Sequence, residues 1–213
     1  MSSPETRQAL AFYFDIYSPF GYLASTQIEK LAARHGRTVD WRPVLIGITV
    51  LKVMGMKPLP TYPMKGPYLA AEMERFAALY GVPYRKHGLS GHNSLAAMRA
   101  FNWIKSFDAP LAVEFAKRMY AKLWVESVDV TPPEVSADVA AELGIAREKT
   151  LAALASDEVK QSLIKSVDDA IAKGVFGVPF VIVDGEKFFG NDHFWLLERW
   201  LKFGRWNPQD GIV

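Results

Sequence analysis

The chain opens with a pattern of apolar positions that changes twice within 45 residues. Residues 10–14 form an uninterrupted apolar run, which predicts a short buried strand. From residue 20 to 34 apolar residues recur every three or four positions, which predicts a helix with one buried face. Alternation over residues 38–45 predicts a second strand that a proline ends. The opening pattern therefore predicts a strand, a helix and a strand.

The helical period then dominates until about residue 173, and prolines and glycines punctuate it. The predicted helices cover residues 66–80, 92–106, 110–124, 133–143, 146–155 and 157–173. The strand pattern returns only near the end of the chain. It predicts strands at residues 180–184 and 187–189 around an Asp184-Gly185 turn, and a closing helix from Asp192 to Lys202.

This order predicts an α/β fold in which a βαβ half and a ββα half flank a large all-helical insertion. Residues 8–47 and 174–213 would form the sheet domain, and residues 48–173 the helical insertion. Two sites stand out within it. Tyr17-Ser18-Pro19 falls at the first junction of strand and helix, and Val178-Pro179 opens the second pair of strands. Together they resemble the active site of a thioredoxin-like fold.

Composition changes this picture at one point, because the chain has no cysteine. In thioredoxin-like folds a cysteine pair usually occupies the junction of strand and helix, where the helix end favours a thiolate. Here Ser18 stands in that place. Disulfide exchange by the protein is therefore excluded, and any reactive sulfur must come from another molecule.

Length and charge narrow the class of protein. A chain of 213 residues with 50% hydrophobic residues can form one domain with an insertion. Its 25 basic and 23 acidic residues are interspersed, so neither a nucleic acid nor a membrane is expected as partner. No apolar stretch is long enough to span a bilayer, and the first residues do not resemble a signal peptide. A cytoplasmic protein is the expectation.

Five stretches, in order and at compatible spacing, resemble the 2-hydroxychromene-2-carboxylate isomerases, which belong with the kappa-class glutathione transferases in the thioredoxin-fold superfamily. They are Phe12 to Phe20, Pro63 to Tyr68, Asn93 to Ala100, Gly174 to Pro179 and Phe189 to Asp192. The resemblance covers nearly the whole chain. It implies that glutathione is the cofactor and that the sheet domain binds it.

The resemblance also assigns roles to single residues. Ser18 would be catalytic, since its hydroxyl would donate to the glutathione thiolate. Val178, before a cis Pro179, would pair with the backbone of the cofactor. Lys65 would meet the glycine carboxylate, and Asn191 and Asp192 the γ-glutamyl end.

Each of these residues also has a plainer explanation. Ser18 and Asp192 are good helix N-caps, Pro179 can open an edge strand, and a lone lysine such as Lys65 is commonly a solvated surface charge. The chain also departs from the family at Met56, where kappa-type sequences often have an asparagine. A methionine cannot supply that amide contact, so another residue must replace it or glutathione is held more weakly. The role of His193 is open.

Candidates for contact with a small aromatic substrate are Tyr17, Phe20, Tyr84, Arg99 and Trp103. The guanidinium of Arg99 could clamp a carboxylate, although an ordinary surface arginine fits the sequence equally well. The four histidines, at positions 35, 87, 92 and 193, form no H-x-x-x-H pair, so no metal is expected. The family resemblance also leads us to expect a homodimer.

The reaction implied by the resemblance is the reversible isomerisation of 2-hydroxychromene-2-carboxylate to trans-o-hydroxybenzylidenepyruvate, in the degradation of aromatic hydrocarbons such as naphthalene. Glutathione would add to the conjugated double bond and leave again after rotation, so it would not be consumed. A kappa-like transferase, which would consume glutathione, is the alternative. A binding module without turnover is a third possibility, against which Ser18, Lys65 and the Asn191-Asp192 pair argue.

Overall fold

A four-stranded mixed sheet forms the centre of the computed structural model, which describes residues 9–85 and 93–210. Its strands are β1 (Leu10–Phe14), β2 (Val39–Pro43), β3 (Phe180–Val183) and β4 (Glu186–Phe189). They lie in the order β2-β1-β3-β4, with β1 parallel to β2 and the other neighbours antiparallel. The sheet therefore joins the two ends of the chain, and β1 and β3 are its inner strands.

Helices make up most of the remainder. The α-helices are α1 (Pro19–Ser25), α2 (Ile28–Arg34), α3 (Lys65–Tyr80), α4 (Leu95–Lys105), α5 (Ala109–Trp124), α6 (Pro133–Glu142), α7 (Arg147–Ala155), α8 (Asp157–Ala172) and α9 (Phe194–Phe203). The shorter ones are the π-helix η1 (Gly47–Val53) and the 3-10 helices η2 (Leu59–Thr61), η3 (Asn191–His193) and η4 (Pro208–Asp210). No helix in the described part of the chain is long and apolar enough to cross a membrane.

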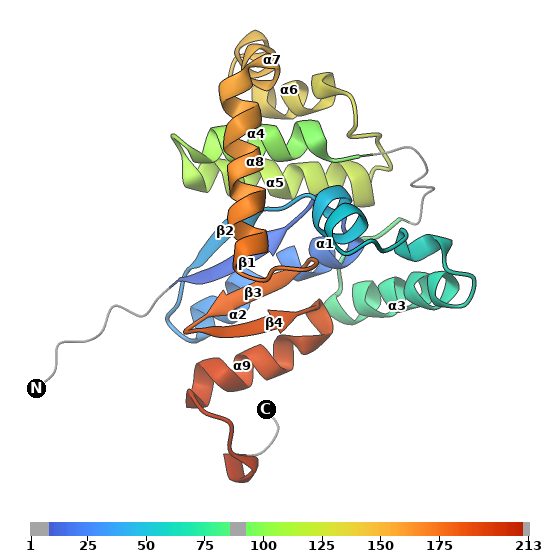
Figure 1. Ribbon diagram of the computed structural model, residues 1–213, viewed down its shortest axis with the longest axis vertical. Coiled ribbons are helices and arrows are strands. Elements are labelled where there is room, and N and C mark those ends of the chain that lie inside the picture. Colours follow the sequence, from blue (N-terminus) through green and yellow to red (C-terminus); the bar gives the residue numbers. More distant parts are fainter. Residues whose placement is uncertain (1–8, 86–92, 211–213) are drawn as a thin grey trace, which may run out of the picture.

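Figure 1 shows helices α4 to α8 gathered at one end of the molecule and α9 at the other, with the sheet between them. Alternate residues of β1 serve different clusters of the core. Phe12 and Phe14 pack with Trp41 in the larger cluster, whereas Tyr13 packs with Phe180 in a second one that includes Ala170 of α8. The predicted α/β fold of thioredoxin type, with helices inserted between its halves, is confirmed.

The single helix predicted over residues 20–34 is wrong, because the chain forms α1 and α2 with a two-residue break at Thr26 and Gln27. The hydroxyls of Ser25 and Thr26 donate back to the carbonyls of Tyr22 and Leu23, at 2.6 and 2.7 Å. Serine and threonine compete in this way with the hydrogen bonds of a helix interior. Apolar spacing alone does not register that competition.

Aspartate and serine side chains cap two helices of the insertion. Asp108 accepts a hydrogen bond from the Leu111 N–H at the start of α5, and Ser156 accepts one from the Val159 N–H at the start of α8. The predicted helix at 92–106 corresponds to α4, and residue 92 lies outside the described residues.

Candidate functional site

Ser18 lies where β1 gives way to α1, and its hydroxyl is the centre of the site. Its Oγ accepts the Gly21 N–H at 3.0 Å, so Ser18 is the N-cap of α1, and Pro19 occupies the first helical position. The same Oγ donates to the Val178 carbonyl at 3.4 Å, across 160 residues of sequence. The structure thus brings together the two segments that the sequence singled out.

The peptide bond between Val178 and Pro179 is cis, as predicted. The Pro179 carbonyl accepts the Gly190 N–H at 2.9 Å, which ties this loop to the turn before α9. In the described part of the chain no hydrogen bond involves the Val178 N–H. Ser18, the cis-proline loop and the Gly190 turn therefore form one connected edge, with a backbone donor left free beside Ser18.

Asn191 and Asp192 differ in exposure. Asn191 is 2% exposed, and its Nδ2 lies 3.5 Å from the hydroxyl of Tyr80, whereas Asp192 is exposed. The alternative that Asp192 caps the closing helix is wrong, because η3 precedes α9 and the N-cap position falls on His193, whose side chain makes no capping bond. The Nδ1 of His193 instead pairs with the Phe189 carbonyl at 2.7 Å. The Asp192 carboxylate lies 3.7 Å from the same Nδ1 and is exposed to solvent.

Lys65 begins α3 and is exposed, and among the described residues it has no ion pair or hydrogen bond through its side chain. The segment before it carries Met56, whose backbone N–H donates to the carbonyl of Val50 in the middle of the π-helix η1. No described contact ties Lys65 to Ser18, so its role stays a prediction.

Tyr17 and Phe20 flank Ser18 and are half-buried. Phe20 packs on the cluster of Leu23 and Met73, which holds α1 against α3. Burial raises the pKa of Tyr17, and the charge of Asp15 adds to that effect. Contact of Tyr17 and Phe20 with a substrate stays a prediction.

The other three candidates for substrate contact lie in two places, since Tyr84 follows α3 whereas Arg99 and Trp103 belong to α4. Tyr84 stacks on Trp124 at 6.3 Å, and burial raises its pKa. Trp103 packs against Phe107 toward the far end of α4. Arg99 is half-buried on α4, and its Nε is covered by protein without a hydrogen-bond partner in the described structure. Their contact with a substrate stays a prediction.

Sequence reasoning missed Asp15, which lies three residues before Ser18 and is 1% exposed. Its Oδ1 accepts the Ser94 hydroxyl at 2.5 Å and the Tyr17 N–H at 2.9 Å, and its Oδ2 accepts the Ile46 N–H at 2.8 Å. Burial raises the pKa of this carboxyl, while the three accepted hydrogen bonds act in the opposite direction. A charged residue at the end of an apolar strand was the signal that could have identified it.

Two side chains of the helical insertion donate hydrogen bonds to the backbone carbonyls of the same turn. The Tyr120 hydroxyl donates to the Asp15 carbonyl at 3.1 Å, and the Trp124 Nε1 donates to the Ile16 carbonyl at 2.9 Å. Both residues belong to α5 and are buried in the main core cluster. Two helices of the insertion, α4 and α5, therefore position the turn that carries Ser18.

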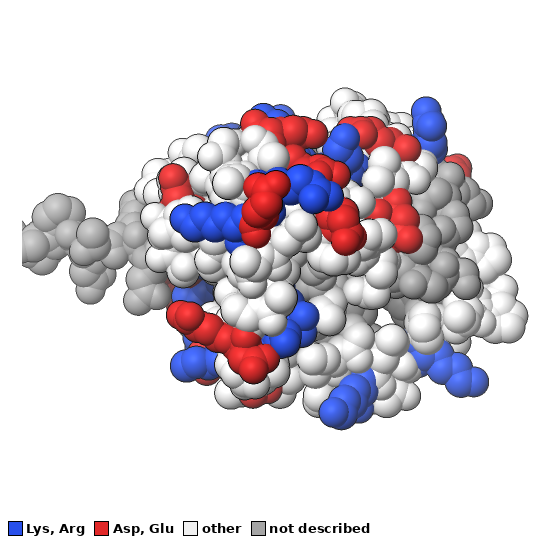
Figure 2. All heavy atoms as spheres, turned by 90° about the horizontal axis from the view of Figure 1, so that it is seen from above, with Lys and Arg blue, Asp and Glu red and all other residues white. Residues whose placement is uncertain are grey.

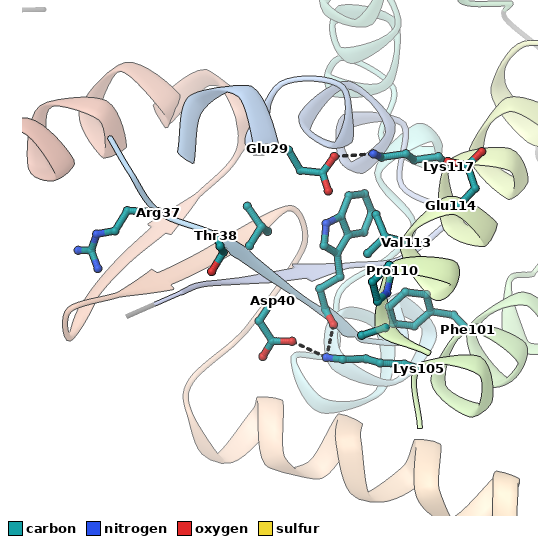
Figure 3. Close-up of a pocket in the computed structure, with 13 residues that line it drawn as sticks. Glu29, Arg37, Thr38, Asp40, Phe101, Lys105, Pro110, Val113, Glu114 and Lys117 are labelled. Atoms are coloured by element: carbon teal, nitrogen blue, oxygen red, sulfur yellow. Dashed lines mark hydrogen bonds and ion pairs between the residues drawn. The ribbon is translucent and has the colours of Figure 1, made fainter. Parts of the chain in front are cut away.

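A cavity of 570 Å³ lies elsewhere, along the outer edge of β2, and contains none of the predicted site residues. Figure 3 shows two ion pairs among the side chains that line it, Lys105 with Asp40 and Lys117 with Glu29. Lys105 also donates to the Trp41 carbonyl at 2.6 Å, so it covers part of the unpaired strand edge. We therefore interpret the contacts of Lys105 as protection of the β2 edge.

Histidine and carboxylate side chains form no cluster able to hold a metal within residues 9–85 and 93–210. His35 pairs with Glu198 at 3.4 Å, and His87 and His92 lie outside the described residues. On the face shown in Figure 2, basic and acidic side chains are intermingled. Some of the exposed charges of the insertion form ion pairs, such as Arg147 with Asp138.

Comparisons with known proteins agree with this architecture. The family model of the DSBA-like thioredoxin domain matches residues 9–202. A 2-hydroxychromene-2-carboxylate isomerase of Pseudomonas putida is 28% identical over 188 residues, which are 88% of this chain and 91% of that protein. The human glutathione S-transferase kappa 1 is 25% identical over 211 residues, 91% of this chain and 93% of that protein. The resemblance drawn from the five sequence stretches is thereby confirmed.

A solved structure agrees with these sequence comparisons. The structure of a 2-hydroxychromene-2-carboxylate isomerase superposes with a TM-score of 0.82 at 26% identity, and the match covers 92% of this chain and 95% of that one. These relatives are enzymes by name, and the similarity extends over nearly the full length of both partners.

Proposed function

The chain belongs to the family of DSBA-like thioredoxin domains, and from this premise we propose that it is a glutathione-dependent isomerase. It would interconvert 2-hydroxychromene-2-carboxylate and trans-o-hydroxybenzylidenepyruvate in the degradation of aromatic hydrocarbons such as naphthalene. Relatives named for this isomerase support the proposal, as does the absence of cysteine, which removes the disulfide chemistry usual in thioredoxin-like folds.

The observation that carries the proposal is the hydroxyl of Ser18, held at a helix start and 3.4 Å from the Val178 carbonyl. A bond of that length is weak, so the hydroxyl proton is easily redirected to a better acceptor. A thiolate is such an acceptor. Because α1 has only seven residues, the hydroxyl is a stronger source of stabilisation than the helix dipole.

The residues around Ser18 fit glutathione by their donor types. The free N–H of Val178 suits a peptide carbonyl, in the manner of an added strand. Lys65 has no counter-charge among the described residues and suits a carboxylate. The exposed carboxylate of Asp192 suits an amine, and the buried amide of Asn191 can orient the same end.

Bound glutathione would supply the sulfur nucleophile that the chain lacks. The protein would stabilise its ionised form, since a free thiol has a pKa of about 8.5 and is mostly protonated at neutral pH. Lowering that pKa by one to two units corresponds to about 1.4 to 2.7 kcal/mol, which a donated hydrogen bond to the charged form can supply. Tyr17 and Phe20 would flank the substrate at the same hydroxyl.

The decisive assay follows the absorbance of the chromene substrate with and without glutathione, in the wild type and in Ser18→Ala. We expect conversion that requires glutathione, leaves its concentration unchanged, and falls by about 10²-fold or more in Ser18→Ala. Equal conversion without glutathione, or an unimpaired Ser18→Ala, would refute the proposal.

A kappa-like transferase is the second candidate, favoured by the similarity to human glutathione S-transferase kappa 1. It predicts that glutathione is consumed when an electrophile such as a halogenated nitroaromatic is offered. The free thiol concentration at the end of the reaction separates the two functions, because only the isomerase returns all of its glutathione.

A further inference from the structure

The buried carboxylate of Asp15 has a bonding pattern that packing alone does not require. Its three partners come from three separate segments: the start of α4, the loop after β2, and the turn between β1 and α1. All three are hydrogen-bond donors. A buried carboxylate without hydrogen-bond donors would cost much free energy, and here three donors surround it.

We propose that Asp15 is the positioning residue of the site, and that its carboxylate fixes the place of the Ser18 hydroxyl by joining these three segments at the turn. The proposal rests on the proposed function in one respect, namely that the hydroxyl acts on a bound thiolate. Asp15 itself touches neither cofactor nor substrate in this scheme.

The path from Asp15 to the hydroxyl is short and continuous. The Asp15 carbonyl accepts the Ser18 N–H at 2.9 Å, while its side chain accepts the intervening Tyr17 N–H. These two bonds close the turn from both sides, as an aspartate commonly does with the backbone two residues on. The Ser18 Oγ then accepts the Gly21 N–H. The Gly21 amide signal is therefore sensitive to any displacement of the hydroxyl.

Only a carboxylate meets all three demands. An asparagine has one oxygen and an NH₂ group, and the NH₂ would face the N–H of Ile46 or that of Tyr17. At least one segment would then be released. Ser94→Ala is a milder change than Asp15→Asn, because it removes one donor and leaves the carboxylate in place.

The first experiment uses the ligand-free protein and the amide signals of Gly21, Tyr17 and Ile46 in NMR spectra. We expect Asp15→Asn and Ser94→Ala to shift the Gly21 signal and to speed amide exchange at Tyr17 or Ile46 by about tenfold or more. Ser94→Thr, which restores the hydroxyl, is expected to return the Gly21 signal to its wild-type position. Ser136→Ala is the matched control, because Ser136 is equally buried, lies on α6 and has no hydrogen-bond partner in the described structure.

The second experiment titrates glutathione bound to each variant by the ultraviolet absorbance of its thiolate. We expect the apparent pKa of the bound thiol to rise in Asp15→Asn and Ser94→Ala, to recover in Ser94→Thr, and to stay unchanged in Ser136→Ala. A residue that only holds the fold together would change stability without moving this titration. A misplaced hydroxyl is also expected to lower kcat more than it changes KM, by about 10- to 100-fold.

The outcomes separate the two proposals. If the wild type binds no glutathione, the proposed function fails, while the Gly21 signal of the ligand-free variants still decides whether Asp15 positions Ser18. If Gly21 and the bound thiol behave as in the wild type in both Asp15→Asn and Ser94→Ala, the positioning role is wrong. Should Asp15→Asn not fold, Ser94→Ala and its threonine rescue decide the question alone.

Discussion

At the scale of the residue, Ser18 combines two roles that use different parts of one hydroxyl. As N-cap it uses a lone pair, which accepts the Gly21 N–H, and as donor it uses its proton, which now points to the Val178 carbonyl. The two roles therefore do not compete. The plainer explanation of Ser18 as a cap and the catalytic one are both compatible with the same geometry.

The two roles can be measured apart. We expect Ser18→Ala to lower the free energy of unfolding by about 1 kcal/mol through loss of the cap, and to raise the pKa of bound glutathione thiol by about one to two units. Asp108→Ala removes a matched cap at the start of α5, away from the site. It is expected to lose the same stability in urea unfolding and to leave the thiol titration unchanged. Equal thiol pKa values in the two variants would deny Ser18 its donor role.

Gly21 is confined by its neighbours as well as by its helix. A Cβ at this position would lie 2.7 Å from the Tyr120 hydroxyl and 3.0 Å from the Ser18 Cβ. Tyr120 is fully buried and bonded to the Asp15 carbonyl, so it cannot move freely. The residue is therefore a close-approach glycine at the centre of the site.

Gly21→Ala is expected to destabilise the protein and to reduce activity. Overpacking costs about 1 to 3 kcal/mol, which exceeds the gain of up to about 1 kcal/mol from the better helix propensity of alanine. Gly47→Ala is the matched control, because an added Cβ there meets nothing within 4 Å. Urea unfolding of both variants tests the argument, and a Gly21→Ala protein as stable as the Gly47→Ala protein contradicts it.

At the scale of the element, local pattern predicted strands and helices well but not their interruptions. The buried run of β1 and the period of α5 follow from apolar spacing. The break at Thr26 depends on a hydroxyl that bonds back to Leu23, and the start of α9 depends on the short η3 turn. Such features arise from individual hydrogen bonds, which periodicity does not encode.

Ion pairs of Asp40 with Lys105 and Arg42 lie along the outer edge of β2. Burial alone would raise the pKa of Asp40, but hydrogen bonds from Lys105 and Arg42 outweigh it, so that the pKa is lowered. A carboxyl whose pKa is lower in the folded state stabilises the fold above its unfolded pKa of about 4, and this contribution is lost as the pH falls through the folded value. The ion pairs on β2 therefore predict acid sensitivity below about pH 4.

Asp40→Asn is expected to lower the free energy of unfolding by about 1 kcal/mol at neutral pH and to flatten its decline below about pH 4. Asp138→Asn, which breaks an exposed pair with Arg147, is the control and is expected to change little. Urea unfolding across the acid range measures both. If wild type and Asp40→Asn decline in parallel, the ion pairs of Asp40 do not govern acid stability.

At the scale of the whole molecule, the helical insertion completes the site that the sheet begins. Ser94, Tyr120 and Trp124 reach the turn before Ser18 across 79, 105 and 108 residues of sequence. The sequence pointed to Ser18, Val178 and Pro179 because each occupies a marked junction between elements. It could not identify the bonds to Asp15, because contacts at such separations depend on the packed fold.

The family resemblance leads us to expect that two copies of the chain form a homodimer. Large apolar side chains are exposed near the start of α3, where Met64 is 90% exposed and Tyr68 lies one turn away. Val53 and Met54, at the end of η1, are exposed as well. Exposed apolar side chains commonly mark an interface, so the start of α3 is where two copies are expected to meet.

Sedimentation equilibrium of the wild type is expected to give twice the chain mass of 23.8 kDa. Met64→Glu would bury a charge in the interface and is expected to shift the mass toward the monomer. Leu79→Glu is the matched control, because Leu79 is also an exposed apolar residue of α3 but lies about 22 Å further along the helix. A monomeric wild type would contradict the dimer, and equal masses for the two variants would place its interface elsewhere.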